Sequence, residues 1–416
     1  MRTVGILGIY AEEDVKSKKT PQSCHSIEKA EDKSELDSTH SELCQAPPYT
    51  MWKMKMMFVS ILCLSLLPFS PADSCTVFRL KADDGVIIVG RSMEFSVDLK
   101  YDIIVVPRNK VYVSPGLDEK GGLSWKTRYG YVGIAPFGLD FALSDGMNEK
   151  GLAFGHLWFE SGMKWQDVAP GERKLALAQV LVGDWILGSF ASVEEVKIEI
   201  QKLKVFKYTD PKSKISPALH FIVYDANGGC IVIEYEDGMC NIYDNPLGIM
   251  TNAPRFPWQL TNLRQYVGMT SEKPEPYQTS GFTFPATGPG AGMFGLPGDL
   301  TPPSRFVRLA TLTRFSDKQP DAERTLNLAQ HIINTFDIPF GLVTDTLPDK
   351  KTVLKESTQW VTFRDLTKRI VYFRTYDNQN LRKIDLNKFD FSGPSVKRIP
   401  MFGTSEIIVD ITDQAH

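Results

Sequence analysis

A segment typical of a secretory signal peptide ends just before Cys75 and determines where the folded part of the chain begins. A basic stretch at 51–55 precedes an apolar run at 57–67, and small residues stand three and one positions before Cys75. This order indicates a cleavable leader, and its apolar run is too short to cross a bilayer as a helix. We therefore interpret 51–74 as a signal peptide and expect 75–416 to fold with cysteine as its first residue.

Cleavage before Cys75 would place two reactive groups on one residue. The thiol is a nucleophile, and the α-amine released beside it has an unperturbed pKa of roughly 7.7 to 8.0. An amine of that basicity can take the thiol proton near neutral pH, as in other catalysts with an N-terminal nucleophile. Four histidines follow the leader, at 156, 220, 331 and 416, and none is paired at ligand spacing. We therefore expect no metal site and favour a catalyst that needs no histidine.

Residues 1–50 differ in composition from the rest of the chain. They are polar and charged, and a stretch such as 28–35 cannot build an apolar core. Because a signal peptide normally stands at the start of a protein, we interpret 1–50 as a non-native or disordered extension. Translation would then begin at one of the methionines between 51 and 57. An unusual pro-segment is the alternative.

Overall composition is that of a globular protein with no polyanionic partner. Of 416 residues, 42% are hydrophobic and 23% charged, and the net charge is -3. A slightly acidic chain is a poor match for nucleic acid or an anionic membrane. No second long apolar run follows the leader, so we expect no membrane association after cleavage and a secreted or periplasmic location.

Strand and helix patterns are grouped rather than alternating. Strand patterns occupy 75–80, 86–91, 101–106, 131–134, 141–143, 152–158, 219–225, 230–243, 360–363 and 370–375, and helical patterns occupy 175–187, 192–203, 303–315 and 321–336. Grouped strands and helices favour an α+β fold with antiparallel sheets over a doubly wound parallel sheet. Ser192 is predicted to cap its helix, with Glu195 as capping-box partner.

Two other patterns are weaker than they look. The spacing G-x-G-x-x-G at 290–295 lies in a Gly- and Pro-rich loop predicted for 270–303, with no strand before it, so we do not interpret it as a dinucleotide site. Cys230 and Cys240 flank a predicted turn at 237–238. Counting outward from that turn pairs Cys240 with Tyr235, so we expect two thiols rather than a disulfide.

Further polar residues stand where they could support Cys75. If 75–91 forms a hairpin, Arg91 and Glu94 lie at its open end beside Cys75, where an arginine would favour thiolate. Asn252 follows a strand and could direct its amide at an oxyanion. Arg305 stands near a helix start, where the dipole does not favour a cation. Each also has an ordinary reading as a surface charge, a turn or a cap.

Taken together, these segments resemble the choloylglycine hydrolase family, which includes penicillin V acylases and bile salt hydrolases. The resemblance extends from Cys75 to about Thr375. It is carried by the post-leader cysteine, Gly90-Arg91-Ser92-Met93-Glu94-Phe95, Asp145-Gly146-Met147-Asn148-Glu149-Lys150-Gly151-Leu152, Thr251-Asn252-x-Pro254, Asn262-Leu263-Arg264-x-Tyr266, Gly295-Leu296-Pro297-Gly298-Asp299 and Ser304-Arg305-Phe306.

This resemblance implies the N-terminal-nucleophile hydrolase fold, a four-layer αββα sandwich, and hydrolysis of linear non-peptide amides without a metal or organic cofactor. Members of the family often form tetramers, so a homotetramer is one expected assembly. The implied catalytic roles are Cys75 as nucleophile and base, Arg91 at the thiolate, Arg305 as support for the charged site, Asn252 as one oxyanion donor through its side chain and Trp158 as the other through its backbone N–H.

Two positions depart from the family pattern. Glu94 replaces the usual Asp beside the N-terminus, and Trp158 replaces the usual Asn or Tyr. Both changes resemble the Gram-negative branch, whose members include penicillin V acylases and enzymes acting on acyl-homoserine lactones, with bile salt hydrolysis as the alternative. Met93, Phe95 and Phe159 are expected to line an apolar substrate pocket, or else to belong to the core.

Two readings from other functional classes remain open. Cys75 could be the acylated residue of a lipoprotein, although Ala72 and Asp73 fit that processing signal poorly. The chain could also be an inactive binding protein on the same fold, which the joint presence of Cys75, Arg91, Asn252 and Arg305 disfavours.

Overall fold

The protein is described by a computed structural model that covers residues 74–414, except 117–120, 161, 212–213, 348–349 and 406. The predicted extension at 1–50 and the predicted leader, apart from Ser74, lie outside the described residues. Cys75 is therefore seen with its peptide bond to Ser74 intact, and both residues belong to the first strand.

A five-stranded antiparallel sheet, here called the first sheet, carries Cys75 at one end. Its strands lie in the order β1 (Ser74–Lys81), β2 (Ile87–Phe95), β18 (Ser357–Asp365), β19 (Ile370–Thr375) and β20 (Asn378–Asp385). β1 and β2 form the predicted hairpin, which turns through Gly85 at a φ of 89°. Strands from the two ends of the sequence thus meet, because β18 pairs with β2.

An eight-stranded antiparallel sheet, the second sheet, packs against the first. Its strands lie in the order β13 (Met239–Asp244), β12 (Cys230–Glu236), β11 (Leu219–Tyr224), β8 (Ala153–Trp158), β7 (Asp145–Asn148), β6 (Tyr131–Ala135), β3 (Asp102–Val106) and β21 (Lys397–Pro400). Apolar side chains of both sheets, such as Val77, Met93 and Ile222, join one buried cluster. The space between the sheets is therefore core.

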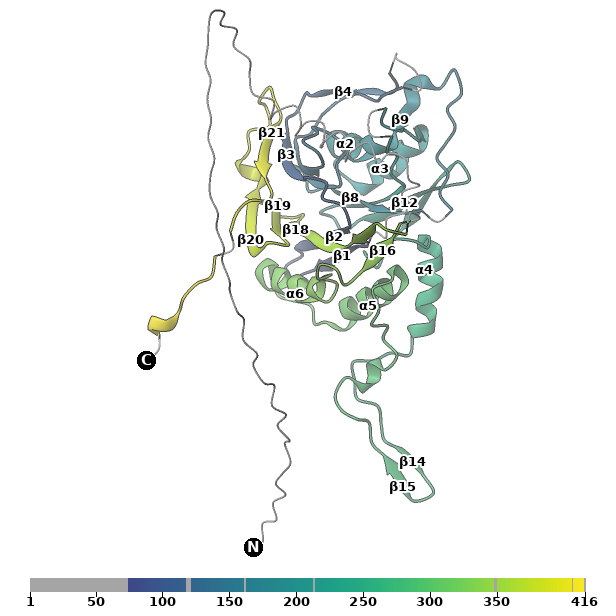
Figure 1. Cartoon of the computed structure of the whole chain (residues 1–416), viewed down its shortest axis with the longest axis vertical. Helices are drawn as coiled ribbons and strands as arrows, with labels where there is room; N and C mark the ends of the chain where they lie inside the picture. Colours follow the sequence, from purple (N-terminus) through teal and green to yellow (C-terminus); the bar gives the residue numbers. More distant parts are fainter. Residues whose placement is uncertain are drawn as a thin grey trace, which may run out of the picture. The chain divides into compact units, whose positions relative to one another are not determined.

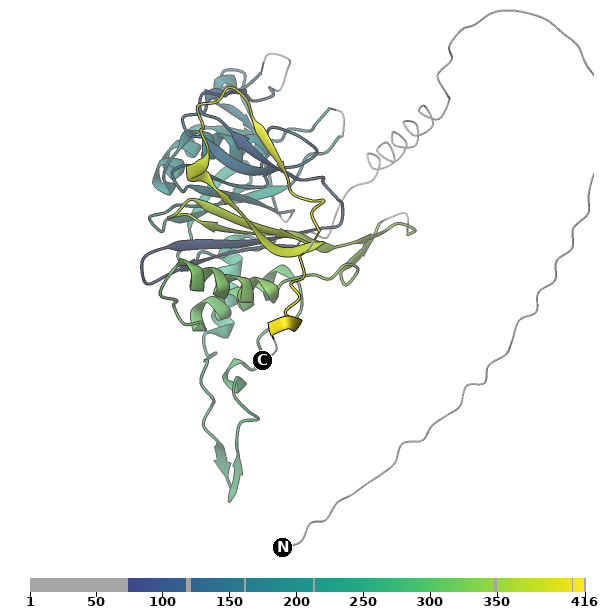
Figure 2. The same cartoon turned by 90° about the vertical axis from the view of Figure 1, so that its left-hand side faces the viewer.

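Helices cover both outer faces. α5 (Pro302–Phe315) and α6 (Ala322–Asn334) pack on the first sheet, and α2 (Val182–Ser189) and α3 (Val193–Glu199) pack on the second (Figures 1 and 2). α4 (Phe256–Leu263) lies beside α5. This arrangement is the αββα sandwich, which confirms the predicted fold class. No helix in the described part of the chain is long and apolar enough to cross a membrane.

The remaining elements are short. The small two-stranded sheets are β4 (Val111–Val113) with β5 (Ser124–Lys126), β9 (Ala176–Ala178) with β10 (Lys204–Phe206), β14 (Tyr277–Thr279) with β15 (Phe282–Phe284), and β16 (Thr344–Thr346) with β17 (Val353–Lys355). The 3₁₀ turns are η1 (Arg173–Leu175), η2 (Gln179–Leu181), η3 (Ile200–Lys202), η4 (Arg264–Tyr266), η5 (Ala291–Met293), η6 (Leu386–Lys388) and η7 (Thr412–Gln414).

Two local predictions need correction. The helix predicted for 175–187 begins only at Val182, because Ala176–Ala178 instead pairs in parallel with Lys204–Phe206. The loop predicted for 270–303 contains the hairpin of β14 and β15, which is exposed along its length and extends away from the helical layer (Figure 1).

Other local predictions are confirmed. Ser192 Oγ accepts a hydrogen bond from the Glu195 backbone N–H at 3.2 Å, which caps α3. The Glu195 carboxylate accepts from the Ala191 N–H, one residue before the expected partner. Cys240 pairs with Tyr235 across β12 and β13, and both Cys230 and Cys240 are free thiols.

Candidate active site

The register of the first hairpin places Cys75 beside the predicted polar residues. Cys75 pairs with Met93, and its thiol lies 3.4 Å from the Met93 sulfur. Because side chains alternate along a strand, Arg91 and Met93 share the face of Cys75, whereas Glu94 lies on the opposite face. The thiol therefore points between the two sheets, and Glu94 points toward the helices.

Arg91 is wholly buried between the sheets. Its guanidinium donates to the backbone carbonyls of Ser144 and His156, and it forms an ion pair with Asp145 at 3.2 Å. It also stacks over the Trp360 ring, 5.2 Å from the centroid. Burial lowers the pKa of Arg91, but Asp145 and Cys75 more than offset this effect, so its pKa is raised and the group stays charged.

A glycine makes room for this guanidinium. Gly155 on β8 lies across from Asp145, and a Cβ at that position would stand 3.2 Å from Arg91 Nη1. Such a contact is tighter than side chains normally tolerate, so any larger residue would press on the arginine. The second sheet thus shapes the surroundings of the thiol from the opposite side.

Asn252 and Arg305 bind the backbone around Cys75. Asn252 Oδ1 accepts from the Cys75 N–H at 2.8 Å and from Arg305 Nη2 at 2.8 Å. Arg305 Nη1 donates to the Cys75 carbonyl at 2.5 Å and to Thr76 Oγ1 at 2.8 Å. Three residues that are far apart in the sequence therefore form one buried hydrogen-bonded group.

Trp158 joins this group through its backbone. Asn252 Nδ2 donates to the Trp158 carbonyl at 3.0 Å. The neighbouring Phe159 N–H donates to Ala218 on the β11 side, and successive residues in an antiparallel pair alternate in direction. The Trp158 N–H therefore points away from β11, to the same side as its carbonyl and Asn252. Among the described residues, Asn252 Nδ2 donates to no second acceptor, so its other hydrogen can bind a ligand.

Two buried carboxylates lie on the helix side of the cysteine. Glu94 pairs across the strands with Ser74 and accepts a hydrogen bond from Thr358 Oγ1 at 3.1 Å. Burial raises the pKa of Glu94 to about 8, although Arg305 opposes the shift. Burial likewise raises the pKa of Glu356 to about 7. The sequence offered no signal for Glu356, because it precedes an ordinary strand.

The predicted apolar contacts divide into two groups. Met93 touches the thiol, and the Phe95 ring lies 6.4 Å from that of Trp158, so these residues form an apolar wall near Cys75. Phe159 is fully buried and stacks on His220 at 4.6 Å. The structure therefore places Phe159 in the core, packed on His220.

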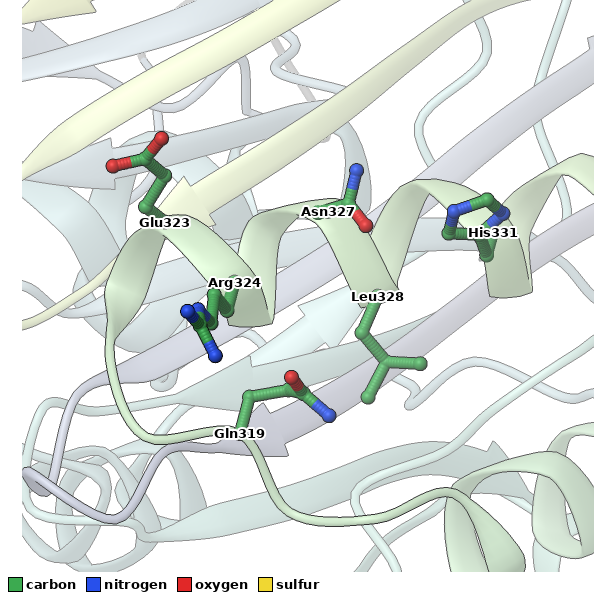
Figure 3. A pocket seen from close by; sticks show the side chains of 6 residues that line it. All are labelled: Gln319, Glu323, Arg324, Asn327, Leu328 and His331. Atoms are coloured by element: carbon green, nitrogen blue, oxygen red, sulfur yellow. The ribbon is translucent and has the colours of Figure 1, made fainter.

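The described residues contain no cluster of three or more His, Cys, Asp or Glu side chains suited to a metal ion. A polar hollow runs along α6 and is lined by Gln319, Glu323, Arg324, Asn327, Leu328 and His331 (Figure 3). This hollow contains none of the predicted site residues. The Gln319 carbonyl accepts a hydrogen bond from the Asp83 N–H, so the hollow lies near the turn of the first hairpin, at the end opposite Cys75.

Comparisons with known proteins all point to one family. Residues 75–399 match the family model of linear amide C–N hydrolases, the choloylglycine hydrolase family. The bile salt hydrolase/transferase of Clostridium perfringens is 32% identical over 78% of this chain and 95% of its own length. The penicillin V acylase of Pectobacterium atrosepticum is 26% identical over 73% of this chain and 78% of its own length.

Solved structures show the same fold. A variant of the conjugated bile acid hydrolase from Clostridium perfringens superposes with a TM-score of 0.71 at 28% identity, covering 81% of this chain and all of that one. The penicillin V acylase of Agrobacterium tumefaciens superposes with a TM-score of 0.64 at 24% identity, covering 80% of this chain and 95% of that one. From its match over 75–399 and these relatives, the chain belongs to the choloylglycine hydrolase family of linear amide C–N hydrolases.

Proposed function

We propose that this protein is a cysteine-nucleophile amidase that cleaves linear non-peptide amides through an acyl-enzyme. The observation that carries the proposal is the Asn252 side chain, which bridges the Cys75 backbone nitrogen and the Trp158 carbonyl while Arg305 holds its oxygen. These bonds support a site in which a thiol, an amide donor and a strand N–H act on one substrate carbonyl. Such a set suits acyl transfer.

The reaction proceeds in two steps. The Cys75 thiolate, beside Arg91, attacks the amide carbonyl, and the oxyanion is bound by the second Asn252 N–H and the Trp158 backbone N–H. Each donor contributes roughly 2.7 to 4 kcal/mol if it behaves like other oxyanion donors. The α-ammonium of Cys75 protonates the departing amine. Water, deprotonated by the same α-amine, then attacks the thioester, which releases the acid and regenerates the thiol.

This mechanism requires the chain to begin at Cys75. In the structure that position is a peptide N–H bonded to Asn252, and the free amine would take its place once Ser74 is removed. Glu94 stands across from Ser74, so we assign its carboxylate to the new α-ammonium. We further propose that the leader directs the protein to a secreted or periplasmic location.

For the acyl group we propose an apolar or aromatic chain, such as phenoxyacetyl or the acyl group of a homoserine lactone. The support is the apolar wall of Met93, Phe95 and Trp158. A conjugated bile salt is the second candidate, favoured by the higher identity to the bile salt hydrolase than to the penicillin V acylase. A panel of the three amides decides between them: turnover of bile salts alone would reject the first assignment.

The nucleophile is tested by Cys75→Ala in the secreted protein. We expect turnover to fall below detection while the thermal stability is kept, because the replaced side chain is small. Cys240→Ala is the matched control, since that thiol lies on β13 away from the group around Cys75 and should leave turnover unchanged. Full activity of Cys75→Ala would refute the proposal.

Mass spectrometry of the secreted protein tests its processing. An unmodified N-terminal Cys75 supports the amidase. A lipid adduct on Cys75 or a retained leader would favour the lipoprotein reading instead.

A further inference from the structure

A second arginine shares the carboxylate that binds Arg91. Asp145 Oδ2 lies 3.2 Å from Arg91 Nη1 and 3.1 Å from Arg364 Nη1. Both arginines have fully buried side chains, and Asp145 is 1% exposed. These three residues, the Arg–Asp–Arg triad, are enclosed between the two sheets. The resemblance to the family included Asp145 in a motif but gave no role to it or to Arg364.

Strand register explains how the triad forms. Arg91 on β2 pairs with Thr362 on β18, and Arg364 follows two residues later, so both arginines point toward the second sheet. Asp145 begins β7 on that sheet and meets them. Cys75 and Met93 share this face with Arg91, so the thiol belongs to the same buried layer.

The triad carries one more cation than anion. Arg364 donates through Nη1 to the Phe154 carbonyl at 2.8 Å, but its Nε and Nη2 have no hydrogen-bond partner among the described residues. A buried charge with unused donors usually costs stability, and an apolar residue of similar volume often serves the fold as well. The stability of the fold therefore does not explain why position 364 carries an arginine.

The surrounding groups do not supply the missing negative charge. Burial lowers the pKa of His156 to about 3 and raises that of Tyr224 well above its usual value, so both are neutral near pH 7. The other titratable or charged groups around the triad and Cys75 are Tyr101, Arg305, Glu94 and Glu356. Glu94 and Thr76, the Arg305 partner, lie on the other face of the sheet. A Cys75 thiolate would balance the triad.

We propose that Arg364 is a positioning residue for the amidase reaction: through Asp145 it holds Arg91 against Cys75, and its charge favours the thiolate. The inference rests on the proposed function for its consequence in catalysis. Its electrostatic part concerns the thiol alone and is measurable without any substrate.

The test is the rate of Cys75 alkylation by iodoacetamide as a function of pH, in protein that begins at Cys75. The midpoint of this pH dependence reports the ionisation of the thiol. In Arg364→Met, whose new side chain is long and apolar, we expect this midpoint to rise by roughly 0.5 to 1 pH unit. That is about a three- to tenfold slower reaction below the midpoint. Arg364→Lys, which keeps the charge, should restore most of the rate. The acid limb of kcat/KM should shift with the midpoint.

Arg374→Met is the matched control, because Arg374 is a nearly buried arginine of the same sheet that contacts Asn334 on α6. It should leave the midpoint unchanged. An unchanged midpoint in folded Arg364→Met, or an equal shift in Arg374→Met, would overturn the proposal. If Arg364→Met does not fold, Arg364→Gln is measured and judged by the same criterion. A shifted midpoint in a protein that hydrolyses no amide would reject the proposed function and keep this inference.

Discussion

The two faces of the first hairpin present opposite charge environments to the same cysteine. On the face toward the second sheet, two arginines share the single carboxylate of Asp145 beside the thiol. On the face toward α5, two carboxylates, Glu94 and Glu356, lie near Arg305, which also has Arg308 as a neighbour. One face therefore has surplus positive charge, and the other has two carboxyl groups.

This difference suits the two reactive groups of an N-terminal cysteine. A thiolate is stabilised by cations, and an α-ammonium is stabilised by carboxylates. Alternation along β1 and β2 sends the two environments to opposite sides of one strand pair. A single sheet can thus favour ionisation of the thiol without repelling the charged amine. Variants on either face can therefore be compared by their turnover, by the alkylation of the thiol and by their stability.

The largest effect is expected when the amine is blocked. A chain that begins at Ser74 keeps the peptide bond seen in the structure, so the Cys75 nitrogen is an amide and cannot act as a base. We expect turnover to fall by about 10²- to 10⁴-fold, the usual contribution of a general base. Alkylation of the thiol should survive, because Arg91 is still in place. Equal turnover by the two chains would show that the amine is not used.

The next effect separates the two faces directly. Arg91→Gln removes the cation beside the thiol, so the midpoint of alkylation should rise by about 1 to 3 pH units. Glu94→Gln changes the opposite face and should leave the midpoint within about 0.3 unit. The measurement is the same pH-dependent alkylation, made on variants with native circular dichroism. Shifts of similar size in both variants would contradict the comparison of the faces.

A smaller effect concerns stability rather than reactivity. In the chain that retains Ser74, the Glu94 pKa of about 8 exceeds its ordinary value of 4.5, so the folded state binds more protons. Stability from this group is complete below pH 4.5 and is lost as the pH rises through about 8. Glu94→Gln should flatten this decline, which is on the order of a few kcal/mol.

Thermal unfolding between pH 4.5 and 8.5 measures that decline. In the chain that begins at Cys75 the α-ammonium should oppose the shift, so its decline should be shallower than that of the Ser74 chain. An identical decline in wild type and Glu94→Gln would disprove the assigned charge environment. Asp184, whose pKa burial raises to about 7, contributes a decline common to all variants.

The smallest effect is expected from a variant that lies on neither face of the first hairpin and serves as a control. Ser192→Ala removes the cap of α3, and the free energy of unfolding should fall by about 1 kcal/mol. Turnover and alkylation should not change, because α3 packs on the far side of the second sheet. Denaturant titration checks the first expectation. A change in the alkylation rate would mean that a loss of overall stability alone alters the reactivity of the thiol. The shifts seen in the other variants could then not be assigned to their charges.

Local features of the site could be anticipated from the sequence. The turn at Gly85 and the alternating strands around it predicted a hairpin that brings Arg91 back to the Cys75 end, and the register places Arg91 on the face of Cys75, two residues from its partner Met93. The pairing of Cys240 with Tyr235 followed from the same kind of counting. Contacts across the sheets could not be predicted: Arg364 and Asp145 meet Arg91 only because β18 and β7 come from distant parts of the chain.

By itself, the sequence determined the hairpin that carries Cys75 and which residues share its face, since a turn and strand alternation act over a few neighbouring residues. The family followed from motifs along the chain. Only the tertiary structure decided which charges surround Cys75, because those charges come from three strands, one helix and the residue before β18, and act through space. It also showed that Phe159 is buried against His220, a contact between residues distant in the sequence.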